Sequence, residues 1–519
     1  MVALKAGRLS RRAVMGLVGA AGVGVATGCQ VDTGEGKSGA NPGGSDPKAI
    51  DFPDFDTELP TDDVTFRWVD SGDLKSVWEK SVLDAFTEKH SNIKTQYDGG
   101  GWDTVNTVVP LGIRNGSAHD VFALPQEVPP QVAINEGWVQ PLEDIIPDFD
   151  EWKANFPEAA LVPGVNIFDD KLYSWPISSS RRLSFMAMYD SANMAEAGYD
   201  DPGAQITTWD ETLEALAAVK KTGKVGLMFG GDGLAGLLYY LAFTAGWKGM
   251  DGAEASVGID FETGERIHAA DEMVAAYEFI EKIVKDKLIV PGYLNTLQAD
   301  ARAQMTANGA GMIFNGPWDI PAWKETAPDW KYSIAAMPTA QGEPYMVPFF
   351  EGANSSWVYA ETKLDTVAGQ IISYMGSPDG QKMMVILSEG NLQSLQPEAN
   401  ETAAQEVDLD PNAQFATDLA KDLMRVAPRV ELRNPDAAQV SLELKPVTPR
   451  FVDRIQGLLI GDIKDAKKEF AKFDSELDAA LDAAIAAAKK KGSSVTREDY
   501  AFSNWDRSKD YTIDLYESA

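Results

Sequence analysis

Residues 64–103 read VTFRWVDSGDLKSVWEKSVLDAFTEKHSNIKTQYDGGGWD. The β-branched and aromatic residues of VTFRWV (64–69) are typical of a strand, and IKTQYD (93–98) is a second such run. Residues 73–90 between them carry apolar side chains at helical spacing, which we expect to share one face: Leu74, Val77, Trp78, Val82, Ala85 and Phe86. A strand, a helix and a strand in this order predict a parallel pair joined by a right-handed crossover.

The segment that follows extends the same pattern. TVNTVVPLGIRNG (104–116) is typical of a helix, which we expect to be interrupted near Pro110, and DVFALP (120–125) is typical of a third strand. Ligands of parallel sheets bind beyond the carboxyl ends of the strands. We therefore expect a ligand-binding edge at the carboxyl ends of these strands. Its residues are Ser71, Trp102, Asp103 and Gln126. A glycine-rich loop (99–101) precedes Trp102, whose ring could stack on a ligand.

A second α/β region follows in the middle of the chain. Strand patterns at 185–190 and 224–230 alternate with helical patterns, which lie at 209–223, 234–246 and 271–289. The segment 475–492 ends in three lysines and a glycine, which is typical of a helix C-terminus. With 519 residues, of which 44% are hydrophobic, the chain is long enough for two to four α/β domains with their own cores.

The N-terminus has the three regions of an export signal. Basic residues at positions 5, 8, 11 and 12 precede an apolar run (13–27), which ends in ATGC (26–29). We interpret residues 1–28 as a lipoprotein signal peptide and Cys29, the only cysteine, as the site of lipid attachment; the alternative is a stray cysteine beside a plain cleavage site. The paired arginines leave twin-arginine and general secretion both open. Residues 29–61, rich in Gly, Pro, Ser and Asp, predict a flexible tether.

Composition and motifs exclude several classes of protein. The formal net charge of −33 disfavours nucleic acid as a partner. The three histidines lack HExxH spacing and one cysteine cannot form a thiolate cluster, so we expect no metal and no cofactor. GDGLAG (231–236) matches a dinucleotide-binding pattern, but it lies outside the first strand–helix–strand unit. We interpret it as a tight strand-to-helix turn.

The tryptophans indicate a carbohydrate site. Four of the 13 stand in segments rich in Gly or Pro: Trp102, Trp175, Trp247 and Trp318. A pyranose ring has an apolar face that packs on an indole ring, while its hydroxyl groups need polar partners. Tryptophans in loops beside polar residues therefore favour a sugar ligand, although a core position is the ordinary alternative for each of them.

Five motifs occur in one order between residues 118 and 358. They are AHDVFALP (118–125), EGWVQPLEDI (136–145), LYSWPISSSRRLSFMAMYDSANMAEAGYDDPGAQITTWDET (172–212), MTANGAGMIFNGPW (305–318) and AAMPTAQGEPYMVPFFEGANSSWV (335–358). Together they resemble the bacterial extracellular solute-binding proteins of family 1, the sugar-binding partners of ABC importers. The resemblance runs from about residue 64 to about residue 490. The segment after residue 492 lies outside it.

This resemblance implies an α/β fold of the two-lobed periplasmic-binding-protein type II class, a hinged Venus flytrap. We expect the first lobe to comprise 62–178 plus 349–395 and the second 181–346 plus 396–519, with crossings near 177–181, 347–350 and 396. The resemblance also implies a ligand site with further residues at the crossings and in the second lobe: Ser179, Arg181, Trp247, Asn315, Trp318, Glu351 and Asn354. The paired Arg181 and Arg182 would either meet an anionic group of the ligand or pair with the acidic protein, and we favour structural pairing for at least one.

The sequence thus predicts a monomeric binding protein on the extracellular face of the cell membrane, held there by a lipid on Cys29. It would capture a carbohydrate, an oligosaccharide by preference, through hinge closure and deliver it to ABC permease subunits, without being an enzyme. The alternatives are a secreted glycoside hydrolase, a protein of the same fold for a non-sugar solute, and a lipoprotein adhesin without a transport role.

Overall fold

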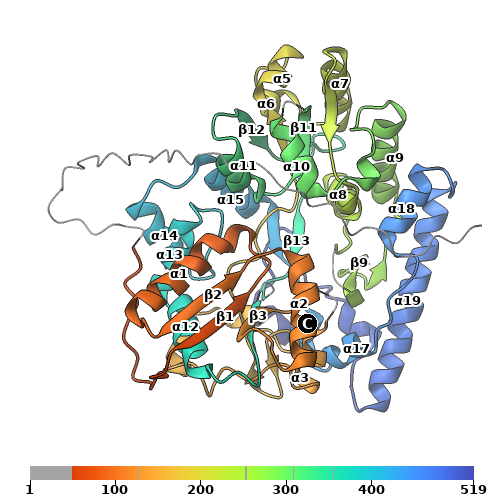
Figure 1. Cartoon of the computed structure of the whole chain (residues 1–519). Helices are drawn as coiled ribbons and strands as arrows, with labels where there is room; N and C mark the ends of the chain where they lie inside the picture. The colour runs from red at the N-terminus through yellow and green to blue at the C-terminus, as the bar shows by residue number, and fades with distance from the viewer. Residues whose placement is uncertain (1–48, 127, 252–253, 308, 353–354, 519) are drawn as a thin grey trace, which may run out of the picture. The chain divides into compact units, whose positions relative to one another are not determined.

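The computed structural model describes residues 49–518 apart from 127, 252–253, 308 and 353–354 (Figure 1). Two sheets form the centres of two groups of elements, called here the first and the second lobe. The predicted signal peptide, Cys29 and the beginning of the predicted tether lie outside the described residues. Within the described part of the chain, no helix combines the length and the apolar character needed to cross a membrane.

The sheet of the first lobe contains the predicted parallel strands. Its order is β2–β1–β3–β14–β6, in which β1 pairs in parallel with β2 and β3 and β14 runs antiparallel to β3 and β6. Their bounds are β1 Val64–Val69, β2 Ile93–Asp98, β3 Val121–Ala123, β6 Ser174–Pro176 and β14 Ser355–Val358. The short hairpin of this lobe consists of β4 Ile167–Phe168 and β5 Lys171–Leu172. The prediction of a parallel strand–helix–strand unit is confirmed.

Helices pack around this sheet. They are α1 Ser76–Lys89, α2 Trp102–Asn115, α3 Pro130–Asn135, α4 Phe149–Lys153, α12 Asp365–Gly376, α13 Pro378–Leu387 and α14 Pro397–Glu406. In α1, Trp78, Val82 and Phe86 are fully buried, as the periodicity predicts, whereas Val77 is 55% exposed. Leu83 is buried with the first three, so the apolar face is rotated away from Val77.

Helix α2 is continuous, which corrects the expected interruption near Pro110. The proline lies inside the helix and is only half-buried. Its ring removes one hydrogen bond of the helix. The helix continues because Val105, Val109 and Gly112 pack its inner face against the lobe, so tertiary contacts outweigh the local cost.

The sheet of the second lobe has the order β12–β7–β11–β8. Strand β11 pairs in parallel with β8, and β7 is antiparallel to both β11 and β12. The strands are β7 Met186–Asp190, β8 Val225–Met228, β11 Ala310–Asn315 and β12 Tyr332–Ala335. The helices are α5 Ser191–Glu196, α6 Pro202–Gln205, α7 Trp209–Lys221, α8 Leu234–Thr244, α9 Asp271–Lys285, α10 Gln298–Thr306, α11 Asp319–Thr326, α15 Pro411–Leu423 and α18 Phe451–Leu459.

The GDGLAG segment forms the predicted strand-to-helix turn. It comprises a 3-10 turn, Gly231–Gly233, and the start of α8. A Cβ atom on Gly231 would lie 2.7 Å from the Cα of Leu294, so the glycine permits a close approach of two backbones.

Three segments connect the lobes. The first is residues 177–185 between β6 and β7, and the second is residues 336–354 between β12 and β14. The second contains β13 Val347–Phe349, which pairs in parallel with β15 Met424–Val426. The third lies at 407–410 rather than near 396, because Ala403 of α14 belongs to the first lobe's core while Ala416 of α15 belongs to the second's.

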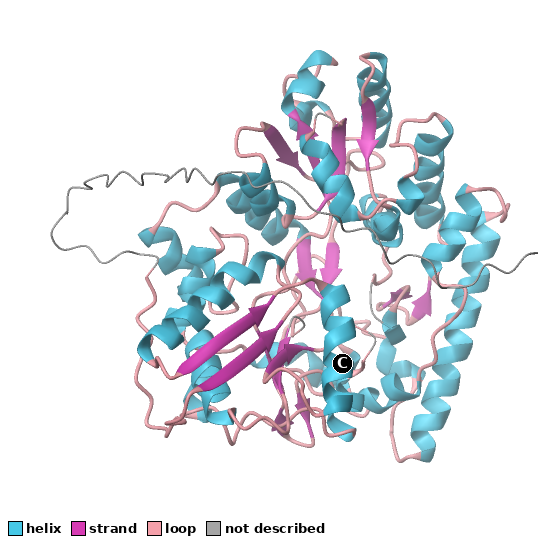
Figure 2. Cartoon of the chain, in the orientation of Figure 1, coloured by secondary structure: helices cyan, strands magenta, loops and turns pink. Residues whose placement is uncertain are grey.

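The C-terminal region adds α16 Val430–Arg433, α17 Ala437–Glu443 and the long α19 Ala466–Lys490 (Figure 2). Together with the hairpin of β9 Ile259–Asp260 and β10 Glu265–Arg266, it encloses a separate hydrophobic core. Three aromatic residues after position 492 belong to this core, namely Tyr500, Phe502 and Trp505. The segment outside the family resemblance is therefore an integral part of the folded protein.

The chain is packed from about residue 50, earlier than the predicted end of the tether at residue 61. Phe52 is 4% exposed and meets the ring of Phe86 at 5.1 Å between centroids. The amide of Gln370 donates a 2.6 Å hydrogen bond to the hydroxyl of Thr57. Residues 49–61 form no helix or strand, but these contacts attach them to the first lobe.

Candidate functional site: a cleft between the lobes

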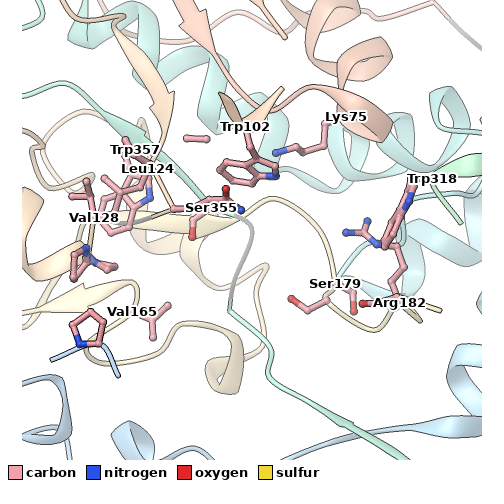
Figure 3. A pocket seen from close by; sticks show the side chains of 18 residues that line it. Lys75, Trp102, Leu124, Val128, Val165, Ser179, Arg182, Trp318, Ser355 and Trp357 are labelled. Atoms are coloured by element: carbon pink, nitrogen blue, oxygen red, sulfur yellow. The ribbon is translucent and has the colours of Figure 1, made fainter. Parts of the chain in front are cut away.

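Two neighbouring cavities lie where the two lobes and the first connecting segment meet. Figure 3 shows the side chains that line one of them. Their volumes are about 820 Å³ and about 460 Å³. Four side chains line both of them: Lys75, Trp102, Arg182 and Trp318. The cavities are therefore two chambers of one cleft, called here the larger and the smaller chamber.

The carboxyl ends of the first lobe's strands open into this cleft, as the topology predicts. The loop after β3 lines the larger chamber through residues 123–126, including Gln126. Ser71, which follows β1, lines the smaller chamber, and its hydroxyl donates a 3.0 Å hydrogen bond to Asp70. The structure thus brings Ser71, Trp102 and Gln126 together. That they contact a ligand stays a prediction.

Trp102 presents its ring to the cleft at the first position of α2. It is 37% exposed, whereas the other tryptophans are buried or half-buried. Gly101 before it has a φ of 86°, a conformation that favours glycine, so the loop turns sharply into the helix. An exposed aromatic ring at the mouth of a polar cavity is a platform on which a flat apolar ligand face packs.

Trp318 lines the same cleft from the second lobe. Its indole Nε1 donates a 3.1 Å hydrogen bond to the Oδ1 of Asn315. The ring folds over Gly316, where a Cβ atom would lie 2.4 Å from it. Asn315 is 2% exposed and lines the smaller chamber, so its main contribution is to orient the tryptophan.

A buried ionic group lies beneath the first-lobe side of the cleft. The Nζ of Lys75 forms an ion pair with Asp70, whose side chain is fully buried. Nearby, the hydroxyl of Tyr97 donates a 2.6 Å hydrogen bond to Glu79. Burial, with the charge of Asp70 as a second cause, raises the pKa of Glu79 to about 8. Glu79 is therefore largely protonated at neutral pH.

A matching pair lies on the second-lobe side. Arg302 of α10 lines the smaller chamber, and its Nη1 is 3.6 Å from the Oδ1 of Asp319. Asn315 donates a 3.0 Å hydrogen bond to the same carboxylate. Burial raises the pKa of Asp319 to about 8, against the opposing effect of Arg302.

The first connecting segment is held by a carboxylate of the second. Glu351 accepts hydrogen bonds from the hydroxyl of Ser179 (2.7 Å) and the backbone N–H of Ser180 (2.9 Å). Burial raises the pKa of Glu351, although these hydrogen bonds oppose the shift. Ser179 lines the larger chamber, whereas Glu351 is not among the residues that line either chamber. Glu351 joins two connecting segments.

The two neighbouring arginines have different surroundings. Arg181 forms a 2.6 Å ion pair with Asp510 and donates to the carbonyl of Met424 at 3.0 Å, and its guanidinium lies over the ring of Phe349. It lines neither chamber of the cleft, so its expected place in the ligand site is not supported. Arg182 lines both chambers. The prediction that at least one arginine pairs structurally is confirmed by Arg181.

Trp247 was expected in the cleft but lies in the core of the second lobe. It is 3% exposed, stacks on Tyr239 at 5.6 Å, and donates a 2.8 Å hydrogen bond to the carbonyl of Ile267. Helix α8 ends in a Schellman motif, in which Gly246 has a φ of 93° and the N–H of Trp247 bonds to Ala242. This motif places the residue after the glycine against the helix. The sequence Ala245-Gly246-Trp247 directly after an apolar helix could have indicated that Trp247 is buried.

The remaining predicted residues lie elsewhere. Asp103 is exposed in the first turn of α2 and does not line either chamber. Trp175 is fully buried in β6. Asn354 and Cys29 lie outside the described residues.

Sequence reasoning missed other lining residues. Lys75 stands four residues after Ser71 and shares the edge that the topology predicts, so the same rule could have included it. Ser355 and Trp357 come from β14, which crosses into the first sheet from far along the chain. Arg302 has no local signal, because only the packing of α10 brings it to the cleft. Among the described residues, no group of three or more His, Cys, Asp or Glu side chains is arranged to hold a metal ion.

Comparison with known proteins identifies the class. Residues 81–417 match the family of bacterial extracellular solute-binding proteins. The chain therefore belongs to this family. It is also 28% identical over 263 residues to proteins of Brucella abortus (strain 2308) and Brucella suis biovar 1 (strain 1330), whose names call them binding proteins and give no ligand. That match covers 50% of this chain and 59% of the length of each relative.

Solved structures share the fold, which confirms the predicted two-lobed type II class. The GacH receptor of Streptomyces glaucescens, solved unliganded and with acarbose, has a TM-score of 0.56 at 17% identity and covers 82% of this chain and 98% of its own. The solute-binding protein of Thermotoga lettingae bound to α-D-tagatose scores 0.58 at 19% identity, with 81% and 100% covered. A Listeria monocytogenes protein in complex with cycloalternan scores 0.57 at 15% identity, also with 81% and 100% covered.

Proposed function

We propose that this protein binds a carbohydrate, an oligosaccharide by preference, in the cleft between its lobes and delivers it to the permease of an ABC importer. The observation that carries the proposal is the placement of Trp102 and Trp318, which line one cleft from opposite lobes. Two indole rings with hydroxyl, amide and cationic groups between them suit the apolar faces and polar rim of sugar rings. The volumes of the two chambers, about 820 Å³ and about 460 Å³, favour a ligand of more than one sugar unit.

Family membership and the neighbours support a sugar as ligand. Three proteins of the same fold were solved with acarbose, cycloalternan and α-D-tagatose. Closure of two lobes around the solute follows from the connecting segments, which provide few points about which the lobes can rotate. In this proposal the protein acts as a monomer and its partners are the permease subunits.

A glycoside hydrolase is the competing function. Such an enzyme needs two carboxyl groups in the cleft, about 5–9.5 Å apart. Of the described residues that line the two chambers, Asp232 is the acidic one. Glu79 and Asp319 are buried behind the surface and do not line a chamber. This arrangement supports binding without turnover.

A thermal-shift screen of the mature protein against neutral and acidic mono- and oligosaccharides tests the proposal. A bound sugar raises the melting temperature by mass action, by an amount that grows with its concentration. We expect at least one oligosaccharide to do so and to be recovered intact after prolonged incubation. Release of shorter sugars would instead identify a hydrolase, and the absence of a shift with every carbohydrate tested would contradict the proposal.

We further propose that residues 1–28 are removed on export and that a lipid on Cys29 holds the protein at the extracellular face of the membrane, with a tether that ends near residue 50. The support is the basic, apolar and small-residue order before the only cysteine. Acyl chains contribute about 0.8 kcal/mol per buried methylene. Cys29→Ala should release the protein into the medium or the wash. Retention of this variant on the membrane would contradict the anchor.

A further inference from the structure

Three basic side chains from three different elements converge on the smaller chamber. Lys75 ends the 3-10 turn Asp73–Lys75, Arg182 belongs to the first connecting segment, and Arg302 lies on α10. Lys75 and Arg182 also line the larger chamber. In Figure 3 the amine of Lys75 lies beside Trp102 and the guanidinium of Arg182 beside Trp318. This concentration of positive charge contrasts with a net charge of −33 for the whole chain.

The acidic partners of these groups lie behind them. Asp70 pairs with Lys75 and Asp319 lies 3.6 Å from Arg302, and both carboxylates are fully buried. The Arg302 side chain itself is 24% exposed. One guanidinium nitrogen faces Asp319, whereas an arginine has five N–H donors in a fixed plane. The Lys75 side chain is only 7% exposed, so Arg302 is the more accessible of these two cations.

The charge balance at neutral pH strengthens this contrast. Burial raises the pKa of both Glu79 and Asp319 to about 8, so each carries little negative charge near pH 7. Of the described acidic residues only Asp232 lines the cleft, and its carboxylate accepts a 2.8 Å hydrogen bond from the backbone of Gln298. Of the described charged residues that line the two chambers, three are basic and one is acidic.

We propose that the carbohydrate bound here is anionic, with a carboxylate or phosphate group held in the smaller chamber by Arg302, Arg182 and Lys75 while sugar rings lie on Trp102 and Trp318. A guanidinium binds either group through two parallel N–H···O hydrogen bonds, which neutral sugars cannot match. This inference rests on the proposed carbohydrate function and narrows its substrate class.

Matched ligand pairs test the inference on the mature protein. One pair is α-1,4-linked trigalacturonate and α-1,4-linked galactotriose, and the other is glucose 6-phosphate and glucose. We expect an acidic member to raise the melting temperature more than its neutral partner, with an affinity that falls as salt is added. Which acidic member binds separates the carboxylate from the phosphate.

Variants separate a specific contact from general charge. Arg302→Gln, made together with Asp319→Asn so that no buried acid loses its partner, should weaken acidic-ligand binding about tenfold or more. The loss should be smaller for the neutral partner than for the acidic ligand. Lys472→Gln is the control, because Lys472 is 58% exposed on α19 and does not line the cleft. Equal losses for acidic and neutral ligands would overturn the inference.

The two proposals fail in different ways. If neutral sugars bind and neither acidic member binds better than its partner, the anionic class is wrong and the carbohydrate function stands. If no neutral or acidic carbohydrate in either experiment binds, the proposed function fails and the inference fails with it.

Discussion

Trp318 is placed by its neighbours. The hydrogen bond from its Nε1 to Asn315 and the absence of a side chain at Gly316 fix the ring over the turn that starts α11. The ring also packs against the hydrophobic core of the first lobe, although β11 and α11 belong to the second. One side chain thus connects the cleft to both lobes.

Trp318→Ala should weaken carbohydrate binding. The loss of one stacking platform costs about 1–3 kcal/mol, which is roughly tenfold to a hundredfold in affinity. Titration calorimetry measures it. Trp247→Ala is the matched control, since Trp247 is buried in the second lobe's core, and it should lower the melting temperature instead. Unchanged affinity in a folded Trp318→Ala protein would contradict the placement.

Asp319 makes stability depend on pH. Burial raises its pKa from 3.8 in the unfolded chain to about 8 in the fold, so the folded state holds this proton more tightly. The stabilisation is complete below about pH 4 and is lost as the pH rises through about 8. Between about pH 4 and 8 the melting temperature of the natural protein should fall relative to that of Asp319→Asn. Parallel profiles would show that Asp319 is ionised throughout.

The sequence predicted some of the individual residues that line the cleft and missed others. Ser71, Trp102 and Gln126 follow strands of a predicted parallel sheet, so the general rule for such sheets located them. Arg302 was missed because its position depends on how α10 packs on the second lobe, which no local pattern encodes. Trp247 was misplaced because a glycine after a helix was taken to mark a loop, whereas here it is part of a C-cap that buries the next residue.

Helix α2 carries the cleft's first-lobe tryptophan at its start and a proline in its middle. An interior proline costs a helix about 3 kcal/mol, partly offset by the stiffness that it gives the unfolded chain. Pro110→Ala should therefore raise the free energy of unfolding by about 1–2 kcal/mol, with ligand affinity unchanged. Denaturant unfolding measures the change. A destabilised variant would show that the pyrrolidine ring itself packs favourably there.

The C-terminal tail holds two connecting elements together. Asp510 pairs with Arg181 of the first connecting segment at 2.6 Å, and its other oxygen accepts a 2.8 Å hydrogen bond from the backbone of Val426 in β15. Strand β15 in turn pairs with β13 of the second connecting segment. The tail therefore contacts the region about which the lobes would rotate.

Asp510→Asn should lower the free energy of unfolding by about 1 kcal/mol, because the pair is charge-assisted but partly exposed to solvent. Asp506→Asn is the control within the same tail, since the Asp506 carboxylate bonds to its near neighbours Ser508 and Lys509. Equal effects of the two substitutions would mean that the link to Arg181 contributes nothing beyond local tail structure.

Among the elements, helices with clear periodicity and caps were predicted best. Helix α7 begins with a capping box of Thr208 and Glu211, and Gly223 with a φ of 88° follows its end, so local signals agree with the fold. The interruption of α2 at Pro110 was predicted wrongly. The rule that proline breaks a helix considers local structure alone, whereas here the packing of α2 on the lobe decides.

On the scale of the whole molecule, the residue pattern predicted the parallel strands of the first lobe and a second α/β region. The family resemblance implied the two-lobed fold and its crossings, while the boundaries needed the structure. Helix α14 packs on the first lobe because Ala403 contributes to its core, which moves the third crossing beyond residue 406. Residues after 492 have no counterpart in the resemblance, and it is their aromatic packing and the contacts of Asp510 that show that they belong to the fold.

The central claim is that one cleft, formed by both lobes, binds a carbohydrate between Trp102 and Trp318. Calorimetric titration of the mature protein with the sugar that gives the largest thermal shift tests it most directly, alongside the double variant Trp102→Ala, Trp318→Ala. We predict one-to-one binding by the natural protein and a loss of about a hundredfold or more in a double variant that still unfolds cooperatively. Equal affinity of the two proteins for the sugar would contradict the account.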